Sequence, residues 1–204
     1  MAQTMGFSLL EKYNIPVVPY KIASSQAQAI KYAQELNFPI ALKLMSNKAL
    51  HKSEYHALSL NLKNEYSVKS EFDRLKKIDK NAKILVQKFI PHPLELILGG
   101  KTDAQFGPTI LLGMGGVYTE ILEDVQIRVC PVPGPQIRSM ITQLRSFPIL
   151  KGARGQKGAS LMHLATILKN LSELMEKETL KELDINPLIV THNGLMAADV
   201  RVIK

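Results

Sequence analysis

Two carboxylates and one amide interrupt a segment near the end of the 204-residue chain that otherwise reads as two β-strands. In "ELDINPLIVTHNGLMAADV", residues 182–200, the polar residues Asp184, Asn186 and Asp199 stand among aliphatic and β-branched residues. Carboxylate and amide oxygens are hard ligands, and a small set of them that leaves room for water and phosphate oxygens suits Mg²⁺. These three side chains are therefore candidates for binding a cation.

The pair Asn193–Gly194 between the two runs predicts a β-hairpin with a two-residue loop. In that register Asn186 lies opposite Arg201 and diagonal to Asp199, within reach of a shared ligand. Because side chains alternate between the faces of a strand, these three residues and Asp184 project from one face.

Both faces of this hairpin also carry apolar residues. Leu188, Val190 and Ala197 share the face of the candidate ligands, and the other face holds Leu183, Ile185, Val200 and Val202. Carboxylates beside a covered surface must be paired, protonated or bound to a cation. On a solvent-facing stripe they need no partner, so a metal site and a polar stripe both remain open.

Three further polar residues stand inside β-rich runs. Lys43 lies in "PIALKLM", Gln87 in "ILVQKFIP" and Glu95 in "LELILGG". A strand lysine either extends its charge to water from an edge or binds a buried anion. For Gln87 and Glu95 the alternative to a functional role is an edge strand with one solvated face.

The glycines of "GMGG", residues 113–116, do not form a dinucleotide-binding fingerprint. The third glycine position is Tyr118, and a β-rich run follows where a helix is needed. The chain also lacks the GxxxxGK[ST] pattern. A glycine-rich loop can still bring backbone N–H groups close to phosphate.

Among the five histidines, His51 stands out because it lies in a polar stretch between Lys48, Lys52 and Ser53. A loop histidine is most often simply solvated. Its titration near neutral pH also makes it a competent nucleophile or proton carrier.

The composition excludes several classes of protein. The chain carries a formal charge of +8, but the lysines are dispersed and there is no tryptophan, so nucleic-acid binding is not expected. No run approaches the ~18 apolar residues of a membrane span. The first 16 residues lack the pattern of a signal peptide, and the single cysteine, Cys130, fits a reducing cytoplasm.

Helical and β-rich patterns alternate along the chain without a linker or repeat, which predicts a two-lobed α+β protein. The lobe boundary is expected near "IPHP", residues 90–93. Predicted helices cover 5–13, 24–37, 67–78, 135–145 and 161–175, and predicted strands cover 38–45, 57–62, 83–89, 94–98, 109–112, 117–122 and 125–132, before the closing hairpin.

Several long motifs, in this order, resemble the nucleotide-binding (beta) subunit of ADP-forming acetate–CoA ligases, relatives of succinyl-CoA ligase in the ATP-grasp superfamily. The passages are "PIALKLMSNKALHKSE", "DAQFGPTILLGMGGVYTEILEDVQIRVCPV", "FPILKGARG" and "ELDINPLIV…AADVRVI". The resemblance implies one ATP-grasp domain over 1–204, with a smaller N-terminal lobe of about 1–90 and a larger C-terminal lobe of about 91–204. In that family the two α+β lobes grip ATP between them.

The resemblance also implies roles for individual residues. Lys43 would contact the nucleotide phosphates, and the hinge after Gln87, at Phe89–Ile90, would receive adenine through its backbone. The other implied contacts are Glu95 with the ribose hydroxyls, Gly115 and Gly116 with the phosphates, Arg128 with a phosphate, and Asn186 and Asp199, with Asp184 close by, as Mg²⁺ ligands.

His51 matches the histidine of the family's "HKSD" motif, although Glu54 replaces the usual aspartate. By resemblance, a CoA-binding alpha subunit makes acyl phosphate and acyl-CoA, and His51 relays the phosphoryl group to ADP. The implied assembly is a hetero-oligomer, expected to be α2β2, acting on small-molecule substrates with ATP/ADP and Mg²⁺ as cofactors.

Two other functions compete with that of an acyl-CoA ligase subunit. One is a stand-alone ATP-grasp carboxylate ligase, for which 204 residues leave little room for an acceptor site. The other is a non-catalytic nucleotide-sensing module, which has no use for the phosphoryl carrier that His51 would provide.

Overall fold

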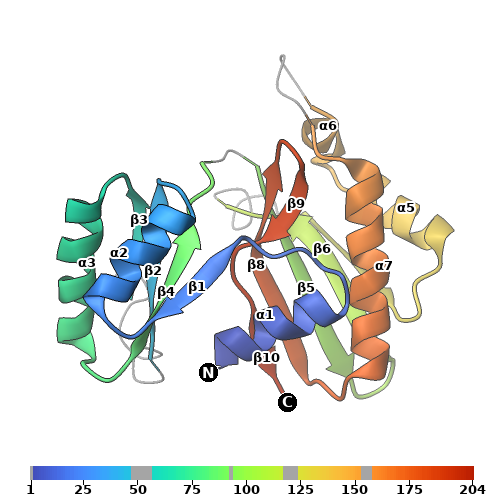
Figure 1. Ribbon diagram of the computed structural model, residues 1–204. Helices are drawn as coiled ribbons and strands as arrows, with labels where there is room; N and C mark the ends of the chain where they lie inside the picture. The colour runs from blue at the N-terminus through green and yellow to red at the C-terminus, as the bar shows by residue number, and fades with distance from the viewer. Residues whose placement is uncertain (1, 47–56, 92–93, 117–123, 153–157) are drawn as a thin grey trace. The chain divides into compact units, whose positions relative to one another are not determined.

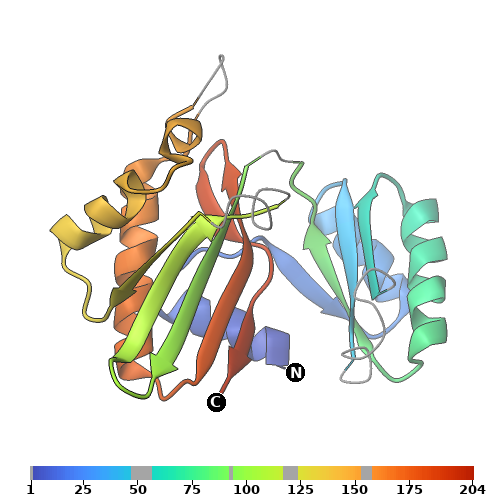
Figure 2. The same cartoon turned by 180° about the vertical axis from the view of Figure 1, so that it is seen from behind.

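The computed structural model describes residues 2–46, 57–91, 94–116, 124–152 and 158–204. The chain divides into two compact units, one of residues 18–91 and one that joins residues 1–17 to 92–204. The two units are described separately below, and Figures 1 and 2 show the elements of each.

The smaller unit is a four-stranded antiparallel sheet in the order β1-β4-β2-β3, with two helices on one face (Figure 1). Its elements are β1 (Tyr20–Ala23), α2 (Gln26–Glu35), β2 (Ile40–Met45), β3 (Leu58–Leu62), α3 (Glu65–Ile78) and β4 (Lys83–Lys88).

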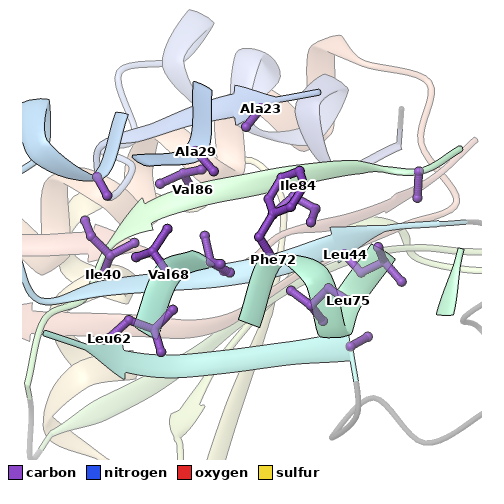
Figure 3. Packing of buried hydrophobic residues seen from close by; sticks show 14 residues of the cluster. Ala23, Ala29, Ile40, Leu44, Leu62, Val68, Phe72, Leu75, Ile84 and Val86 are labelled. Atoms are coloured by element: carbon purple, nitrogen blue, oxygen red, sulfur yellow. The ribbon is translucent and has the colours of Figure 1, made fainter. Parts of the chain in front are cut away.

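Helix α3 forms because its apolar residues Val68, Phe72 and Leu75 recur at helical spacing and are all buried. Asn64 and Ser67 close its first turn as a reciprocal capping box. The helix packs against β2 and β3, and its buried stripe joins Ile40, Leu44, Ile84 and Val86 in one hydrophobic cluster (Figure 3).

The larger unit is a six-stranded antiparallel sheet in the order β10-β8-β5-β6-β7, with β9 paired to β8. Helix α7 packs against β5 and β6, and α5 packs against α7 and β7. Its elements are α1 (Ala2–Lys12), β5 (Glu95–Asp103), β6 (Gly107–Met114), β7 (Val125–Val129), α5 (Gly134–Thr142), α6 (Phe147–Leu150), α7 (Leu161–Lys177), β8 (Glu182–Thr191), β9 (Gly194–Ala197) and β10 (Arg201–Ile203).

The first 17 residues pack on the larger unit although they begin the chain. The Tyr13 hydroxyl donates to Glu178 at 3.0 Å, and the Ala197 N–H donates to the Pro16 carbonyl at 2.8 Å. Helix α1 also contacts β10. The division therefore differs from the expected lobes of about 1–90 and 91–204 at the N-terminus, because an amphipathic helix does not specify in sequence which sheet it will cover.

The α+β prediction is confirmed, since every pairing between the named strands is antiparallel and helices cover one face of each sheet. Within the described ranges, no helix combines the length and apolar character that crossing a bilayer requires.

Candidate functional site

The hairpin that carries the candidate metal ligands forms, but in a different register from the predicted one. Thr191 pairs with Gly194, so the two-residue loop is 192–193, and Asp184 pairs with Arg201. The predicted loop at Asn193–Gly194 is wrong because Gly194 itself begins β9, with φ +136°, and packs against the His163 ring. The register moves by two residues, which leaves the residues of β10 on the predicted face.

A bulge interrupts β8 at residues 186–187. Ile185 pairs with Leu98 and Leu188 pairs with Leu96, so two residues of β8 stand opposite Ile97. The bulge reverses the alternation, and Leu188 consequently shares the face of Ile185. The predicted placement of Leu188 beside Asp184 is therefore wrong, since simple alternation cannot anticipate an inserted residue.

Asp184 projects from the sheet face opposite α7. It pairs with Gly99, while the neighbouring Gly100 faces α7, since a Cβ there would lie 2.3 Å from the Met175 sulfur. Alternation along β5 places Glu95 on the same face as Gly99. This surface, which Figure 2 views from the side opposite α7, is called the open face below.

Asn186 and Asp199 stand across from each other where β8 meets the connection between β9 and β10. The Ala198 N–H donates to the Pro187 carbonyl at 2.9 Å, which continues the register of the β8–β9 pairing. That register brings Asn186 opposite Asp199, closer than the predicted diagonal relationship. Asn186 is exposed and Asp199 is half-buried.

The electrostatics of this corner fit a cation. Burial raises the pKa of the Asp184 carboxyl, and the nearby carboxylates of Glu182 and Asp199 raise it further, against the opposing effect of Arg201. A site that disfavours its own negative charge gains most from a bound positive ion. Among the described residues, no three His, Cys, Asp or Glu side chains form a metal-binding group, so the candidate set relies on the amide of Asn186.

Gly113 and Met114 end β6, and Gly115 and Gly116 follow it; these four residues, called the glycine turn below, lie against the start of β5. The Gly115 N–H donates to the Glu95 carbonyl at 2.7 Å, and a Cβ on Gly115 would lie 2.9 Å from the Glu95 carbonyl carbon. Gly116 has φ +65°, and its Cβ position is 3.6 Å from a Glu95 carboxylate oxygen. Because the Glu95 backbone lies this close, a larger residue than glycine does not fit at position 115. Gly115 and Gly116 consequently lie beside Glu95.

Arg128 lies in the same sheet but on the opposite face from Asp184. It pairs with Ile110, which pairs with Gly100 on the α7 side. Its guanidinium donates to the Gln143 side chain at 2.6 Å and to the Ile127 carbonyl at 2.7 Å. The phosphate contact of Arg128 stays a prediction, and the sheet separates this side chain from the open face.

In the smaller unit, Lys43 and Gln87 share the sheet face opposite α2 and α3. Lys43 pairs with Leu85, and Gln87, which is 8% exposed, lies two residues beyond Leu85 on β4. Strands β2 and β4 are both central in their sheet. The edge-strand alternative is therefore wrong for both residues, and it is equally wrong for Glu95 because β5 lies between β8 and β6.

The predicted hinge follows β4. The Phe89 N–H donates to the Pro39 carbonyl at 3.0 Å, so a backbone contact between this residue and adenine would use the Phe89 carbonyl. Ile90 is half-buried beside it. The predicted phosphoryl carrier His51 lies outside the described residues.

One buried carboxylate, Asp124, escaped the sequence analysis. It accepts hydrogen bonds from the backbone N–H groups of Arg145 and Ser146, each at 2.8 Å, and from the Ser146 hydroxyl. Its only signal in the sequence is an acidic residue directly before a strand, a pattern that does not distinguish a buried carboxylate from a surface one.

Comparison with known proteins places this geometry in a family. A model of the ATP-grasp domain matches residues 1–203. The beta subunit of ADP-forming acetate–CoA ligase I from Pyrococcus furiosus is 34% identical over 203 residues, which cover 96% of this chain and 88% of that one. The ADP-forming 4-hydroxybutyrate–CoA ligase of Nitrosopumilus maritimus is 34% identical, and the match covers 97% of this chain but 30% of that longer one.

A solved structure has the same fold at similar identity. It is the dinucleotide-forming acetyl-coenzyme A synthetase 1 of Ca. Korarchaeum cryptofilum, with a TM-score of 0.87 and 30% identity over 98% of this chain and 91% of that one. The chain therefore belongs to the ATP-grasp family, in the branch that includes the beta subunits of ADP-forming acetate–CoA ligases.

Proposed function

We propose that this chain is the nucleotide-binding subunit of an ADP-forming acyl-CoA ligase. Together with a CoA-binding alpha subunit it would catalyse acyl-CoA + ADP + phosphate ⇌ acid + ATP + CoA. The observation that carries the proposal is the corner where the β8–β9 register brings Asn186 opposite Asp199, with the Asp184 carboxyl near enough for Asp199 to raise its pKa, in a chain that belongs to this family.

The relatives support both the chemistry and the ligands. The Pyrococcus furiosus relative is a beta subunit of an acetate–CoA ligase that forms ADP. The Korarchaeum synthetase was solved with coenzyme A and Mg-AMPPCP, with its phosphohistidine segment pointing towards the nucleotide site. We extend the same class of ligand, a nucleotide with Mg²⁺, to this chain.

In the larger unit, Asp184, Asn186 and Asp199 would hold Mg²⁺ through carboxylate and amide oxygens. A magnesium ion bound there supplies positive charge that neutralises nucleotide phosphate oxygens. Glu95 would accept hydrogen bonds from the ribose hydroxyls, and the backbone of Gly115 and Gly116 would approach the phosphates.

In the smaller unit, Lys43 would place its ammonium group against the phosphates. Its position on a central strand between Leu58 and Leu85 supports this role, because an apolar frame strengthens a charge–charge interaction. The backbone at Phe89–Ile90 would contact adenine, with Gln87 buried two residues before Phe89.

His51 would carry the phosphoryl group. A β-phosphate oxygen of ADP attacks the phosphorus of the phosphohistidine, the new P–O bond completes ATP, and the P–N bond breaks. The electron pair of the broken bond stays with the imidazole, which leaves as a neutral ring because its other nitrogen carries a proton throughout the transfer. Lys43 would stabilise the charge that spreads over the transferred group.

The CoA chemistry would come from another polypeptide. The Nitrosopumilus relative is a longer chain, of which the match covers 30%, and this supports an additional CoA-binding part. We propose that an alpha subunit supplies it here. The α2β2 stoichiometry and a cytoplasmic location stay predictions.

The test is reconstitution with an alpha subunit of this enzyme class. The mixture should form ATP from acetyl-CoA or another acyl-CoA, ADP and phosphate only with Mg²⁺, and the isolated chain should bind Mg-ADP without turnover. ATP consumption by the isolated chain with a carboxylate and an amine would support the stand-alone ligase. Nucleotide binding without turnover under every condition would support the sensing module.

A further inference from the structure

Asp124 is a buried carboxylate in the larger unit that the proposed chemistry does not use. The residue is 6% exposed, and three hydrogen bonds reach its carboxylate from Arg145 and Ser146. Burial alone would raise the pKa of Asp124, but the hydrogen bonds from Ser146 and Arg145 hold that pKa below its ordinary value. The carboxylate is therefore held in its ionised form by hydrogen bonds within the protein.

Asp124 begins a row of polar contacts between β7 and the segment that joins α5 to α6. Gln126 donates to the Gln143 carbonyl at 3.5 Å, and Arg128 donates to the Gln143 side chain at 2.6 Å. Alternate residues 124, 126 and 128 thus all turn toward residues 143–146. Of the three, only Asp124 lies next to the glycine turn.

The backbone of Asp124 borders the glycine turn directly. The Met114 N–H points at the Asp124 carbonyl at 3.4 Å, and a Cβ on Gly113 would lie 3.3 Å from the same oxygen. On its other side the turn is held by the Glu95 backbone, which accepts from Gly115. The turn therefore lies between two backbone supports, and the side chain of Asp124 anchors one of them.

We propose that Asp124 is a positioning residue for the nucleotide phosphates. By fixing its own backbone to Arg145 and Ser146, it holds the glycine turn in the shape that presents Gly115 and Gly116 to the phosphate groups. The inference rests on the proposed nucleotide-binding function and adds to it one residue that determines the affinity for phosphate groups. Loss of the anchor lowers affinity for the phosphate-bearing part of the ligand and spares contacts with the nucleoside.

The test compares ADP with adenosine, which lacks phosphates, in the full-length chain with Mg²⁺. Asp124→Asn keeps the size of the side chain and removes its charge, and Ser146→Ala removes one of the three hydrogen bonds. The matched control is Ser172→Ala, because Ser172 is a similarly buried serine of the same unit that accepts from the Val132 N–H at 3.0 Å. All affinities are measured well below each variant's melting temperature.

Asp124→Asn is expected to weaken ADP binding about tenfold and Ser146→Ala by a smaller factor, in keeping with hydrogen bonds to a charged group. Adenosine binding should stay within about twofold in both variants, and Ser172→Ala should keep the wild-type ratio of the two affinities. If Asp124→Asn does not fold, the ratio of ADP affinity to adenosine affinity in Ser146→Ala decides the question.

An unchanged ratio in Asp124→Asn and Ser146→Ala, with only a lower melting temperature, would overturn the inference. The inference would also be overturned if the variants lost affinity for ADP and adenosine equally and Ser172→Ala showed the same loss. That result would mark a purely structural role for Asp124. Failure of the wild-type chain to bind Mg-ADP would instead refute the proposed function.

Discussion

Asp184 and Arg201 are directly paired across β8 and β10, yet the pKa of the Asp184 carboxyl lies above its ordinary value of 3.8. Burial and the carboxylates of Glu182 and Asp199 outweigh the guanidinium on the neighbouring strand. The fold thus keeps a carboxylate where its charge is costly. A bound cation would offset that cost, which is the arrangement expected of a ligand-binding site rather than of a structural ion pair.

Asp184→Asn should stabilise the protein without Mg²⁺ at neutral pH. The folded state holds the Asp184 proton to a higher pH than the unfolded state does. As the pH rises from the ordinary pKa of the carboxyl through its raised pKa, Asp184 therefore lowers the free energy of unfolding. This loss of stability persists at higher pH. Unfolding by urea from pH 3.5 to 8 measures the effect. A variant equally or less stable at neutral pH would contradict the burial argument.

Asp199→Ala should remove the part of nucleotide-induced stabilisation that depends on Mg²⁺. Ligand at a hundredfold excess over its Kd stabilises the wild type by about 2.7 kcal/mol. Melting curves with ADP, with and without Mg²⁺, separate the two contributions. If the variant kept the full Mg²⁺ response, the hairpin would not be the metal site.

Lys43→Met should weaken nucleotide binding by about 1–3 kcal/mol, the range for hydrogen bonds to charged groups and their loss. Methionine keeps the apolar stem that packs between Leu58 and Leu85, so the fold should persist. Calorimetric titration with Mg-ADP measures the change. Wild-type affinity in the variant would leave Lys43 without a ligand role.

Gly115→Ala should destabilise the protein by about 1–3 kcal/mol, as overpacking does, and should weaken nucleotide binding as well. The added Cβ would lie 2.9 Å from the backbone of Glu95, which cannot move without shifting β5. Gly134→Ala is the matched control, since a Cβ at Gly134 meets nothing within 4 Å. Equal melting temperatures for the two variants would show that the glycine turn is less tightly held than described.

The sequence predicted the two strands of the closing hairpin more reliably than their register or the faces of the residues beyond the bulge. The hairpin from Glu182 to Ile203 was expected, but its loop and the bulge at 186–187 depend on the packing of Gly194 against His163 and of β8 against β5. Such contacts join residues far apart in the chain, and no local pattern encodes them.

Two other features follow from long-range packing in the same way. Helix α1 is recognisable from its apolar spacing, but its partner β10 lies at the other end of the chain. In the sequence Asp124 resembles a surface residue, and only the folded chain brings the backbone N–H groups of Arg145 and Ser146 to its carboxylate. The candidate ligands were accessible to sequence analysis because they are polar residues in apolar strands, which a core would exclude without a function.

The most direct test of the account is whether a phosphoryl group passes from His51 to ADP. The chain and the proposed alpha subunit, supplied with acyl-CoA and labelled phosphate, should yield an acid-labile and base-stable phosphohistidine at position 51, and Mg-ADP should discharge it as labelled ATP. His51→Ala should keep the affinity for Mg-ADP and lose both the label and ATP formation. ATP formation at the normal rate by His51→Ala with its partner would contradict the relay.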